Sequence, residues 1–378
     1  MLLLEHDGKR LLEHFGVPVP AGIMVRTDAN VPSTDLPDGP LVVKAQVATG
    51  KRGKSGGVLM ALGQTEVVAA LARLRGLRIA GQPVEWARVE AAVPFTREHY
   101  VSLSLDPAGG RVRLLFSAAG GIDVETAGRG ELLSADMSLD EADIGKAADA
   151  VTRQLPPTTA DVLRDATTGL ARAFLESDAT LIEINPLFVL GDGSWVAGDA
   201  KVIIDENALQ RRPFIEKLVR SADGRYRDLT TKLDAGFDYM VIDAQGSIGL
   251  LTTGAGLTMM LIDELRARGH APHNFCDIRT GQIHDDPSRL VEVLTWLRAA
   301  PAVDTILINV FAGITDLENF SLRFVEAARQ VDLGGTRVLA RLIGRNGDKA
   351  AEVLNAWSPR LQVFTDLDAA ISALAEAR

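Results

Sequence analysis

Residues 247–268 read SIGLLTTGAGLTMMLIDELRAR, and this stretch decides the fold of the second half of the chain. Its apolar start predicts a strand over 247–252, its glycines predict a turn, and 257–268 has the pattern of a helix. The same order recurs further on: strand 305–311, turn 312–314 and helix 316–330; strand 337–343, turn 344–347 and helix 348–357; strand 361–364 and helix 367–377. Strands that alternate with helices predict a parallel, doubly wound sheet covered on both faces.

The first half of the chain has a different organisation. Apolar residues at helical spacing predict a helix over 2–15, which Gly16 ends. The segments after it are mostly predicted strands, with two more helices: strands 41–43, 58–61, 84–92, 100–105, 112–117, 179–185 and 194–202, and helices 65–75 and 160–177. The segment 210–236 is charged and weakly patterned, so we place a boundary there, between domains 1–230 and 231–378. We expect an α/β protein with an α+β N-terminal part.

Composition limits the possible functions. The length of 378 residues suits about two or three domains, and a hydrophobic content of 47% suits an ordinary globular protein. The net charge of −10 argues against a nucleic-acid or membrane partner, although a local group of cations can still hold a small anion. The single cysteine and the histidine spacing do not suggest a zinc site. Without a signal-peptide pattern or a long apolar run, we expect a cytoplasmic protein.

The loop at residues 48–57, ATGKRGKSGG, is the first candidate for ligand binding. Glycines let a backbone bend closely around a phosphate, and the loop's three basic side chains supply positive charge. Its spacing fits neither the P-loop pattern nor the dinucleotide-binding glycine pattern. A phosphate site and a solvated basic turn therefore both remain open. Lys44, at the end of strand 41–43, is open in the same way between a phosphate contact and a side chain that snorkels to solvent.

Three residues with side-chain oxygens form a second candidate. Glu183 and Asn185 are two apart on a predicted strand and share a face, while Asp199 lies on the predicted partner strand. Mg²⁺ takes few protein oxygens and keeps water or phosphate oxygens in its remaining positions. A magnesium site fits this arrangement, and so does an ordinary group of polar residues near strand ends.

Glycine-rich turns of the second half form a third candidate, at residues 252–256, 311–315 and 344–347. Each turn follows a predicted strand and opens a helix. Backbone N–H groups and a helix dipole then face the edge at which open α/β sheets bind ligands, so we expect at least one turn to bind an anion. The sequence shows no Ser–His–Asp order, nucleophile elbow or paired catalytic carboxylates.

Taken together, these segments resemble the β subunit of succinyl-CoA synthetase and its malate–CoA ligase relatives. The match follows the family's order over roughly residues 1–350 and rests on LLEHFGVPVPAG, VVKAQV, GKRGKSGG, LIEINPL, AGDAK, ENAL, GAGLTMMLID and NVFAGI. LIEINPL combined with RGKSGG is far more specific than any single glycine motif. The resemblance implies an ATP-grasp fold followed by a flavodoxin-like, parallel-sheet CoA-ligase domain.

The resemblance also implies a reaction. In this family, ATP phosphorylates a histidine of an α subunit, the phosphoryl group passes to a carboxylic acid, and CoA displaces phosphate to give a thioester. The phosphohistidine and most CoA contacts belong to the α partner, in a heterodimer or an α2β2 assembly. This chain is then expected to bind ATP and Mg²⁺ and to supply part of the site for a small carboxylic acid.

Site residues follow from the motifs that match. Nucleotide phosphates are expected at Lys44 and at the turn Lys51, Arg52 and Gly53. The adenosine pocket is expected at Glu90, Val93 and Glu98, and the Mg²⁺ ligands at Asn185 and Asp199. The turn Gly313, Ile314 and Thr315 is expected to open a helix whose N-terminus points at the phosphohistidine or phosphate.

Departures from the family pattern are concentrated in the acid-binding half. Thr253 stands where the family has an asparagine that contacts the acid, Arg279 where it has glycine, and Thr315 where it has valine. We infer that the acid is not succinate, and expect it to contact Thr253, Arg279, Gly313 and Thr315. Arg279 could instead pair with Asp277, Asp285 or Asp286 in a surface loop.

Two other functions remain open. A non-catalytic nucleotide or acyl-CoA sensor could keep this fold, and the altered turns permit it, although the retained Asn185, Asp199 and basic loop argue against it. A stand-alone ATP-grasp ligase that joins a carboxylate to an amine is disfavoured by the flavodoxin-like half.

Overall fold

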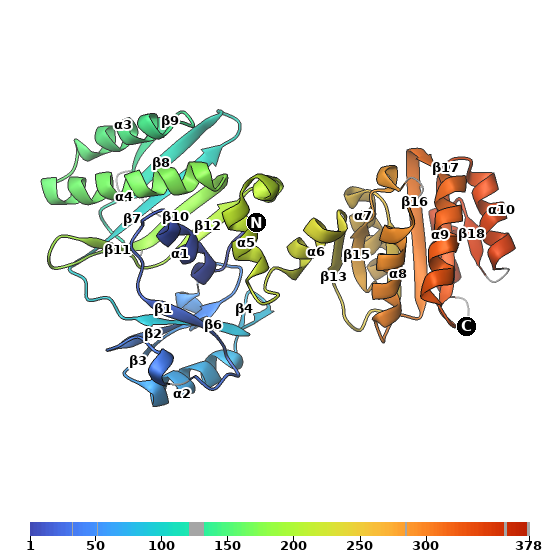
Figure 1. Cartoon of the computed structure of the whole chain (residues 1–378), viewed down its shortest axis with the longest axis horizontal. Coiled ribbons are helices and arrows are strands. Elements are labelled where there is room, and N and C mark those ends of the chain that lie inside the picture. Colours follow the sequence, from blue (N-terminus) through green and yellow to red (C-terminus); the bar gives the residue numbers. More distant parts are fainter. Residues whose placement is uncertain (32, 51, 121–131, 284–285, 359–360, 376–378) are drawn as a thin grey trace. The chain divides into compact units, whose positions relative to one another are not determined.

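The computed structural model describes residues 1–31, 33–50, 52–120, 132–283, 286–358 and 361–375 (Figure 1). The chain divides into two compact units, unit 1 from Met1 to Leu218 and unit 2 from Val219 to Arg378. This division falls within the charged segment 210–236. The domain boundary between residues 230 and 231 stays a prediction.

Helices of unit 1 include two that the sequence did not predict, α3 and α5. The bounds are α1 Glu5–His14, α2 Gln64–Arg75, α3 Glu141–Thr152, α4 Pro157–Glu176 and α5 Pro213–Arg220, which crosses the division, with 3-10 turns at Ser33–Asp35, Gly53–Ser55 and Glu206–Arg211. Those of unit 2 are α6 Arg227–Ala235, α7 Ala255–Ala267, α8 Ser288–Ala299, α9 Leu317–Val331, α10 Gly347–Trp357 and α11 Leu367–Leu374, with a 3-10 turn at Thr280–Gln282. Within the described ranges, no helix is long and apolar enough to cross a bilayer.

Unit 1 is built on two antiparallel sheets. The first has the order β1-β6-β2-β3, with β1 Gly22–Arg26, β2 Leu41–Gln46, β3 Val58–Ala61 and β6 Trp86–Ala91. The second has the order β11-β10-β7-β8-β9, with β12 also paired to β10, and its bounds are β7 Arg97–Asp106, β8 Arg111–Ser117, β9 Leu133–Met137, β10 Ala179–Val189, β11 Trp195–Ala197 and β12 Lys201–Ile204. A small separate pair consists of β4 Arg78–Ile79 and β5 Gln82–Pro83.

The alternation of side chains along β2 and β6 separates the core of the first sheet from its polar face. On β2, Val43 and Ala45 enter a core that also contains Leu71 and Leu74 of α2. On β6, Ala87 and Val89 enter the same core. Because successive strand residues point to opposite faces, Lys44, Arg88 and Glu90 project from the other face. The register pairs Lys44 with Arg88 and Val42 with Glu90, which brings these charges together.

Unit 2 contains a parallel sheet of order β14-β16-β17-β18, with β14 Ile248–Thr252, β16 Thr305–Asp316, β17 Arg337–Arg345 and β18 Gln362–Phe364. An unpredicted antiparallel pair, β13 Asp238–Val241 and β15 Asn274–Asp277, continues it beside β14. The Asn274 side chain joins the two parts, accepting from the Leu250 N–H at 2.8 Å and donating to the Leu250 carbonyl at 2.9 Å. The resulting order β15-β14-β16-β17-β18 is the flavodoxin-like order 2-1-3-4-5. This confirms the predicted doubly wound fold.

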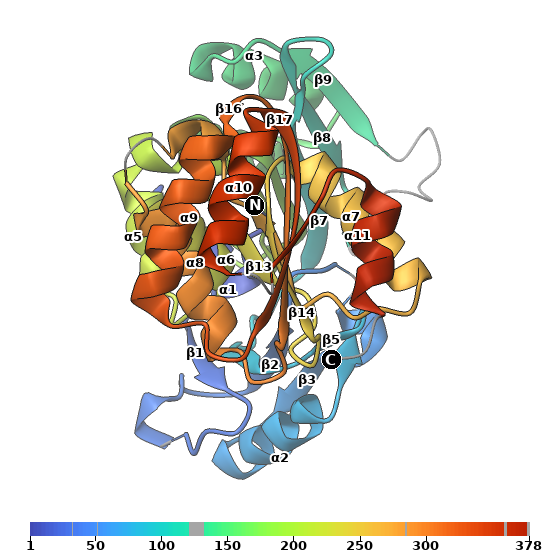
Figure 2. The same cartoon turned by 90° about the vertical axis from the view of Figure 1, so that its right-hand side faces the viewer.

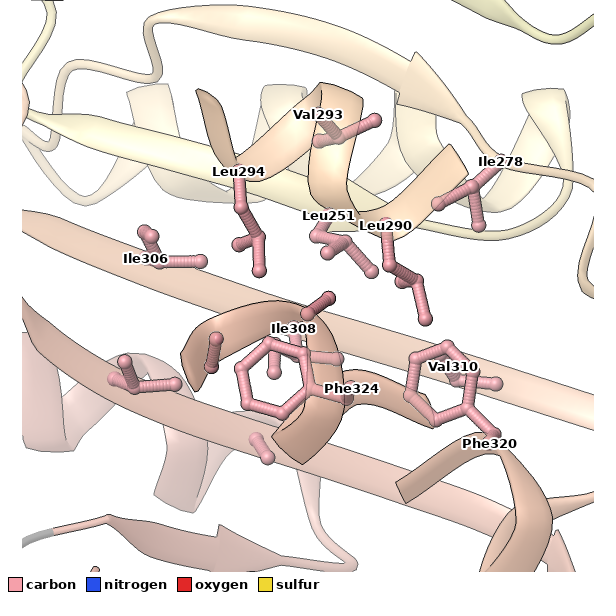
Figure 3. Close-up of a cluster of buried hydrophobic side chains, with 14 of the residues drawn as sticks. Leu251, Ile278, Leu290, Val293, Leu294, Ile306, Ile308, Val310, Phe320 and Phe324 are labelled. Atoms are coloured by element: carbon pink, nitrogen blue, oxygen red, sulfur yellow. The ribbon is translucent and has the colours of Figure 1, made fainter. Parts of the chain in front are cut away.

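Helices cover both faces of the parallel sheet (Figure 2). On one face, α8 and α9 place Leu294 and Phe324 against Ile306 and Ile308 of β16 in the cluster that Figure 3 shows. On the other face, α7 and α11 enclose a second cluster that includes Leu307. Ile306, Leu307 and Ile308 therefore alternate between two cores, as a strand buried on both faces must.

The end of β16 differs from the sequence prediction. The predicted turn over 312–314 lies within β16, at a register irregularity between Ala312 and Asp316 in its pairing with β17. Helix α9 begins at Leu317, and the Asp316 side chain caps it by accepting from the N–H groups of residues 318 and 319. Gly344 of β17 lies so close to this bend that a Cβ there would collide with the Ala312 carbonyl oxygen. The bend is thus held by a cap and by a close backbone approach.

Replacing Phe324 by alanine tests the core of unit 2. Phe324 is fully buried and packs edge-on against Trp357, so we expect Phe324→Ala to lower the free energy of unfolding of unit 2 by about 3–5 kcal/mol. Leu322, on the same helix, is 44% exposed, and Leu322→Ala serves as the matched control with an expected change below about 0.5 kcal/mol. Urea unfolding followed by circular dichroism measures both. Similar losses in the two variants would show that this core is not organised around Phe324.

Candidate functional site

A cavity of about 670 Å³ opens between the two sheets of unit 1. Its walls combine apolar and charged side chains from both sheets, from the start of α1 and from the turn before β12. The apolar part includes Val42, Val58, Met60, Val93, Phe95 and Phe188, and the charged part includes Glu5, Lys44, Arg52, Glu90, Glu183, Asp199 and Lys201. Such a mixture suits a ligand with a flat apolar part and a charged part.

Most of the predicted nucleotide and metal residues meet in this cavity. The lining includes Lys44, Arg52, Gly53, Glu90, Val93, Asn185 and Asp199. Lys51 lies outside the described residues. Glu98 is half-buried on β7 and is absent from the described lining, and its carbonyl oxygen accepts from the Gly120 N–H at 2.9 Å. The structure therefore brings together two predicted phosphate cations and both predicted Mg²⁺ ligands, but not Glu98.

Lys44 is held in the cavity wall by acceptors on three sides. Its Nζ lies 2.9 Å from Glu5 Oε1 and 2.6 Å from Glu90 Oε1, and donates to the Gly198 carbonyl at 2.6 Å. Burial alone lowers the pKa of the Lys44 ammonium, but Glu5 and Glu90 outweigh it, so the pKa lies above its ordinary value. Lys44 is therefore charged at neutral pH, and its side chain is 13% exposed on the cavity side.

Arg52 links the basic loop to both walls of the cavity. Its Nη1 donates to Glu5 Oε2 at 2.7 Å, while Nη2 donates to the two carboxylate oxygens of Asp199 at 2.7 and 2.9 Å. The side chain is 11% exposed, so these contacts are largely shielded from water. Arg52 thus attaches its loop to α1 and to the turn before β12, while Gly53, Lys54 and Ser55 of the same loop are exposed.

Sequence reasoning missed three charged residues below this wall. Glu5 and Lys9 come from α1 and Arg88 from β6, and all three are buried. Lys9 Nζ lies 2.9 Å from Glu5 Oε1 and 2.7 Å from Glu90 Oε2, and Arg88 Nε donates to Glu90 Oε2 at 2.6 Å. The available signal was Glu5, Asp7 and Lys9 at the start of a helix, but an i,i+4 pair of this kind is typical of exposed helix faces.

Burial and the surrounding cations have opposite effects on the two buried carboxyls. Burial raises the pKa of Glu5, but Lys44, Lys9 and Arg52 outweigh it and hold the pKa well below its ordinary value. The same balance, with Lys9 and Lys44 as the main cations, lowers the pKa of Glu90. Both groups are therefore carboxylates at neutral pH.

The predicted metal ligands fit Mg²⁺ by the chemistry of their donors. Asn185 and Asp199 supply an amide and a carboxylate, and Glu183 lines the same cavity two residues before Asn185. Within the described residues, no group of three or more His, Cys, Asp or Glu side chains is placed to hold a metal. Mg²⁺ needs only one or two protein carboxylates when a phosphate supplies other ligands. The Asp199 carboxylate already binds a cation, the Arg52 guanidinium, through both of its oxygens.

In unit 2, the predicted acid-binding residues lie at the carboxyl edge of the sheet: Thr253 follows β14, Arg279 follows β15, and Gly313 and Thr315 lie in the irregular end of β16. Thr253 is buried, and its hydroxyl has no hydrogen-bond partner among the described residues. Thr315 is buried and its hydroxyl lies 2.8 Å from that of Thr280. Arg279 is exposed and donates to Asp238 Oδ2 at 2.7 Å, a partner that the sequence analysis did not consider.

Gly313 and Ile314 do not open a helix, contrary to the prediction. Ile314 is 94% exposed, and α9 begins three residues after it. The carboxylate of Asp316 accepts from the first free N–H groups of the helix and also from Asn346 Nδ2 at 2.8 Å. An anion at this helix end would have to compete with Asp316.

The chain matches two family models in the order that the fold presents. The ATP-grasp domain matches residues 2–189, and the CoA-ligase domain matches residues 251–359. The solved structure of ATP citrate lyase from Methanothrix soehngenii, in complex with citrate and coenzyme A, superposes with a TM-score of 0.72, covering 96% of this chain and 95% of that one at 18% identity. The fold is therefore that of proteins that join an ATP-grasp domain to a CoA-ligase domain.

Relatives that match over nearly their whole length identify the family within this class. The β subunit of ADP-forming succinate–CoA ligase from Chloroflexus aurantiacus is 33% identical over 100% of this chain and 99% of the relative. The corresponding subunit of Bacteroides thetaiotaomicron is 32% identical over 99% and 100%, and that of Myxococcus xanthus is 31% identical over 94% of each. The chain belongs to the family of ADP-forming succinate–CoA ligase β subunits, which confirms the resemblance and the ATP-dependent acid–CoA ligase class that it implied.

Removing the charge of Glu5 gives a pH-dependent test of the buried cluster. Glu5→Gln keeps the shape but leaves buried cations without a partner, so we expect the free energy of unfolding of unit 1 at pH 7 to fall by about 3–5 kcal/mol. Because the folded pKa lies below the ordinary value of 4.5, the stabilisation by Glu5 is complete above about pH 4.5 and is lost as the pH falls toward the folded pKa.

Urea unfolding between pH 3.5 and 8 measures this dependence. Glu13→Gln, at an exposed position of the same helix, is the control and should change stability by less than about 0.5 kcal/mol. A difference between wild type and Glu5→Gln that stays constant down to pH 3.5 would contradict a charged role for Glu5.

Proposed function

We propose that this chain is the β subunit of an ADP-forming carboxylate–CoA ligase and that it binds ATP–Mg²⁺ in the cavity of unit 1. The observation that supports this most strongly is the convergence of Lys44, Arg52, Asn185 and Asp199 on one cavity in a chain of this family. Two cations and two oxygen ligands are what a magnesium-bound triphosphate requires.

Within this proposal, the charged wall takes the phosphates and the apolar wall takes the base. Lys44 and Arg52 would neutralise phosphate oxygens, together with Lys51 and the backbone at Gly53. Val93 lies in the lining with Phe95, where an adenosine would meet it, and Glu98 remains a proposed contact at its margin. Glu90 is bound by Lys9, Lys44 and Arg88, so its effect on the nucleotide would act through Lys44.

Asn185 and Asp199 would hold the Mg²⁺, which when bound supplies positive charge for the terminal phosphates. For Asp199 to serve, its carboxylate must exchange the Arg52 guanidinium for the metal. Arg52, which lines the same cavity, would then be available to bind the phosphates. The same residue would thus hold the empty site together and bind the incoming anion.

The acid and CoA parts of the proposal involve a second subunit. Relatives named as β subunits support an α-type partner, to which we assign the phosphohistidine and most of the CoA contacts, in a heterodimer or an α2β2 assembly in the cytoplasm. Thr253, Arg279, Gly313, Ile314 and Thr315 would form this chain's share of the acid and acyl-phosphate site. Because Thr253, Arg279 and Thr315 depart from the family pattern, we propose an acid other than succinate.

The decisive experiment measures ADP release by the chain copurified with its α-type partner, in the presence of CoA and a panel of mono-, di- and hydroxycarboxylates. We expect one acid to stimulate turnover well above succinate. Binding of ATP–Mg²⁺ without stimulation by any acid would favour the sensor function instead.

Asp199→Asn tests the nucleotide part of the proposal in the same assay. Loss of a metal-binding carboxylate should lower kcat by about a hundredfold or more and raise the Mg²⁺ concentration for half-maximal activity. Asp192→Asn, in the exposed turn before β11, is the matched control and should leave both unchanged. Equal behaviour of the two variants would remove Asp199 from the metal site.

Arg279→Ala tests the acid contact. Loss of a charged hydrogen bond to the acid should raise its KM by roughly ten- to a hundredfold and leave the KM for ATP unchanged. Asp238→Asn removes the Arg279–Asp238 ion pair but keeps the Arg279 side chain. This control separates a contact between Arg279 and the acid from an effect of the ion pair alone. If both variants change the acid KM equally, Arg279 acts only through that ion pair.

A further inference from the structure

The buried charges of unit 1 form two layers that differ in access to the cavity. Lys44 and Arg52 line the cavity and are 13% and 11% exposed. The side chains of Lys9 and Arg88 lie beneath them and are 0% and 3% exposed, and neither belongs to the described lining. Glu5 and Glu90 lie between the layers and contact cations of both.

Lys9 is bound as an ammonium with a complete set of acceptors. Its Nζ donates to Glu90 at 2.7 and 3.0 Å and to the Gly198 carbonyl at 2.9 Å, and it lies 2.9 Å from Glu5 Oε1. Three acceptor groups require three N–H bonds, and a neutral amine has only two. Burial lowers the pKa of the Lys9 ammonium, and the Glu5 carboxylate opposes this effect. The three acceptor groups around Nζ require the charged form.

If ATP–Mg²⁺ binds in this cavity, its phosphates would meet only the cations of the upper layer. To neutralise phosphates, Lys44 must loosen its contacts with Glu5 and Glu90, and Arg52 must loosen those with Glu5 and Asp199. Two buried carboxylates, Glu5 and Glu90, then depend on the two lower cations, Lys9 and Arg88. A buried carboxylate left without a partner is strongly unfavourable, so the lower cations decide whether the upper ones can be released.

We propose that Lys9 is a positioning residue for nucleotide binding: it neutralises Glu5 and Glu90 from below, so that Lys44 and Arg52 are free to bind phosphate. This rests on the proposed function, that ATP–Mg²⁺ binds in this cavity. Lys9 does not touch the nucleotide. Without it, Lys44 stays bound to the carboxylates, and the charge available to the phosphates falls.

The test compares Lys9→Met, Glu5→Gln and the double variant by calorimetric titration of the full chain with the ATP analogue AMPPNP and Mg²⁺. Lys9→Met should weaken binding by about tenfold or more, because two carboxylates then retain the upper cations. Adding Glu5→Gln removes one carboxylate and restores the balance, so the double variant should bind within about threefold of wild type. Removal of Glu5 also relieves the charge imbalance in the fold, so affinities are compared only among variants that thermal unfolding shows to be folded, where loss of a residue that serves only folding would leave the affinity unchanged.

Lys146→Met is the matched control, because Lys146 is an exposed lysine of unit 1 paired with Asp143, and its affinity should equal that of wild type. Thermal unfolding establishes which variants are folded. If Lys9→Met does not fold, the double variant is compared with Glu5→Gln alone. These two variants differ only at Lys9, and their affinities for AMPPNP should differ by less than about threefold. Wild-type affinity in folded Lys9→Met, or a tenfold loss in the double variant relative to Glu5→Gln, overturns the inference. Failure of wild type to bind the analogue overturns the proposed function instead.

Discussion

The buried carboxylate of Glu5 imposes the constraint on which the arrangement of the cavity depends. A carboxylate removed from water is tolerated only when cations and hydrogen-bond donors surround it. Glu5 lies on α1, and its cations come from α1 itself, from β2 and from the loop at Arg52. Arg52 then reaches Asp199 in the turn before β12. Charge neutralisation therefore links α1, β2, the Arg52 loop and the turn before β12 to one another.

The fold was predictable where the pattern of apolar residues within a single segment identifies it as a strand or a helix. Alternation of strands and helices identified the parallel sheet of unit 2, because strands such as Thr305–Val310 are buried on both faces and read as continuous apolar runs. The pair β13 and β15 gave no such signal, since β15 is attached to β14 partly through the Asn274 side chain rather than a full backbone ladder. The register irregularity at the end of β16 likewise depends on its fit to Gly344, which no local pattern contains.

The grouping of the candidate residues in one cavity was predictable only for those that stand in recognisable motifs. Lys44, Arg52, Asn185 and Asp199 stand in segments with a family pattern, and the structure gathers them. Glu5 and Lys9 stood in an ordinary amphipathic helix, where an i,i+4 pair usually faces water. Their burial depends on Glu90, 81 positions from Lys9 in the sequence. Pairing across that separation is a property of the tertiary fold, and no periodicity or spacing in the sequence encodes it.

The described charged contacts of the cavity are confined to one of the two units. Every charged partner of Lys44 and Arg52 among the described residues lies between Glu5 and Asp199, inside unit 1. Substitutions at Thr253, Arg279 or Thr315 would break none of these contacts. Changes to Glu5 or Lys9 are different, because each removes a charge that several neighbours share. Substitutions at the turns of unit 2 would therefore leave the charged cluster of unit 1 intact, whereas substitutions at the base of the cavity would disturb it.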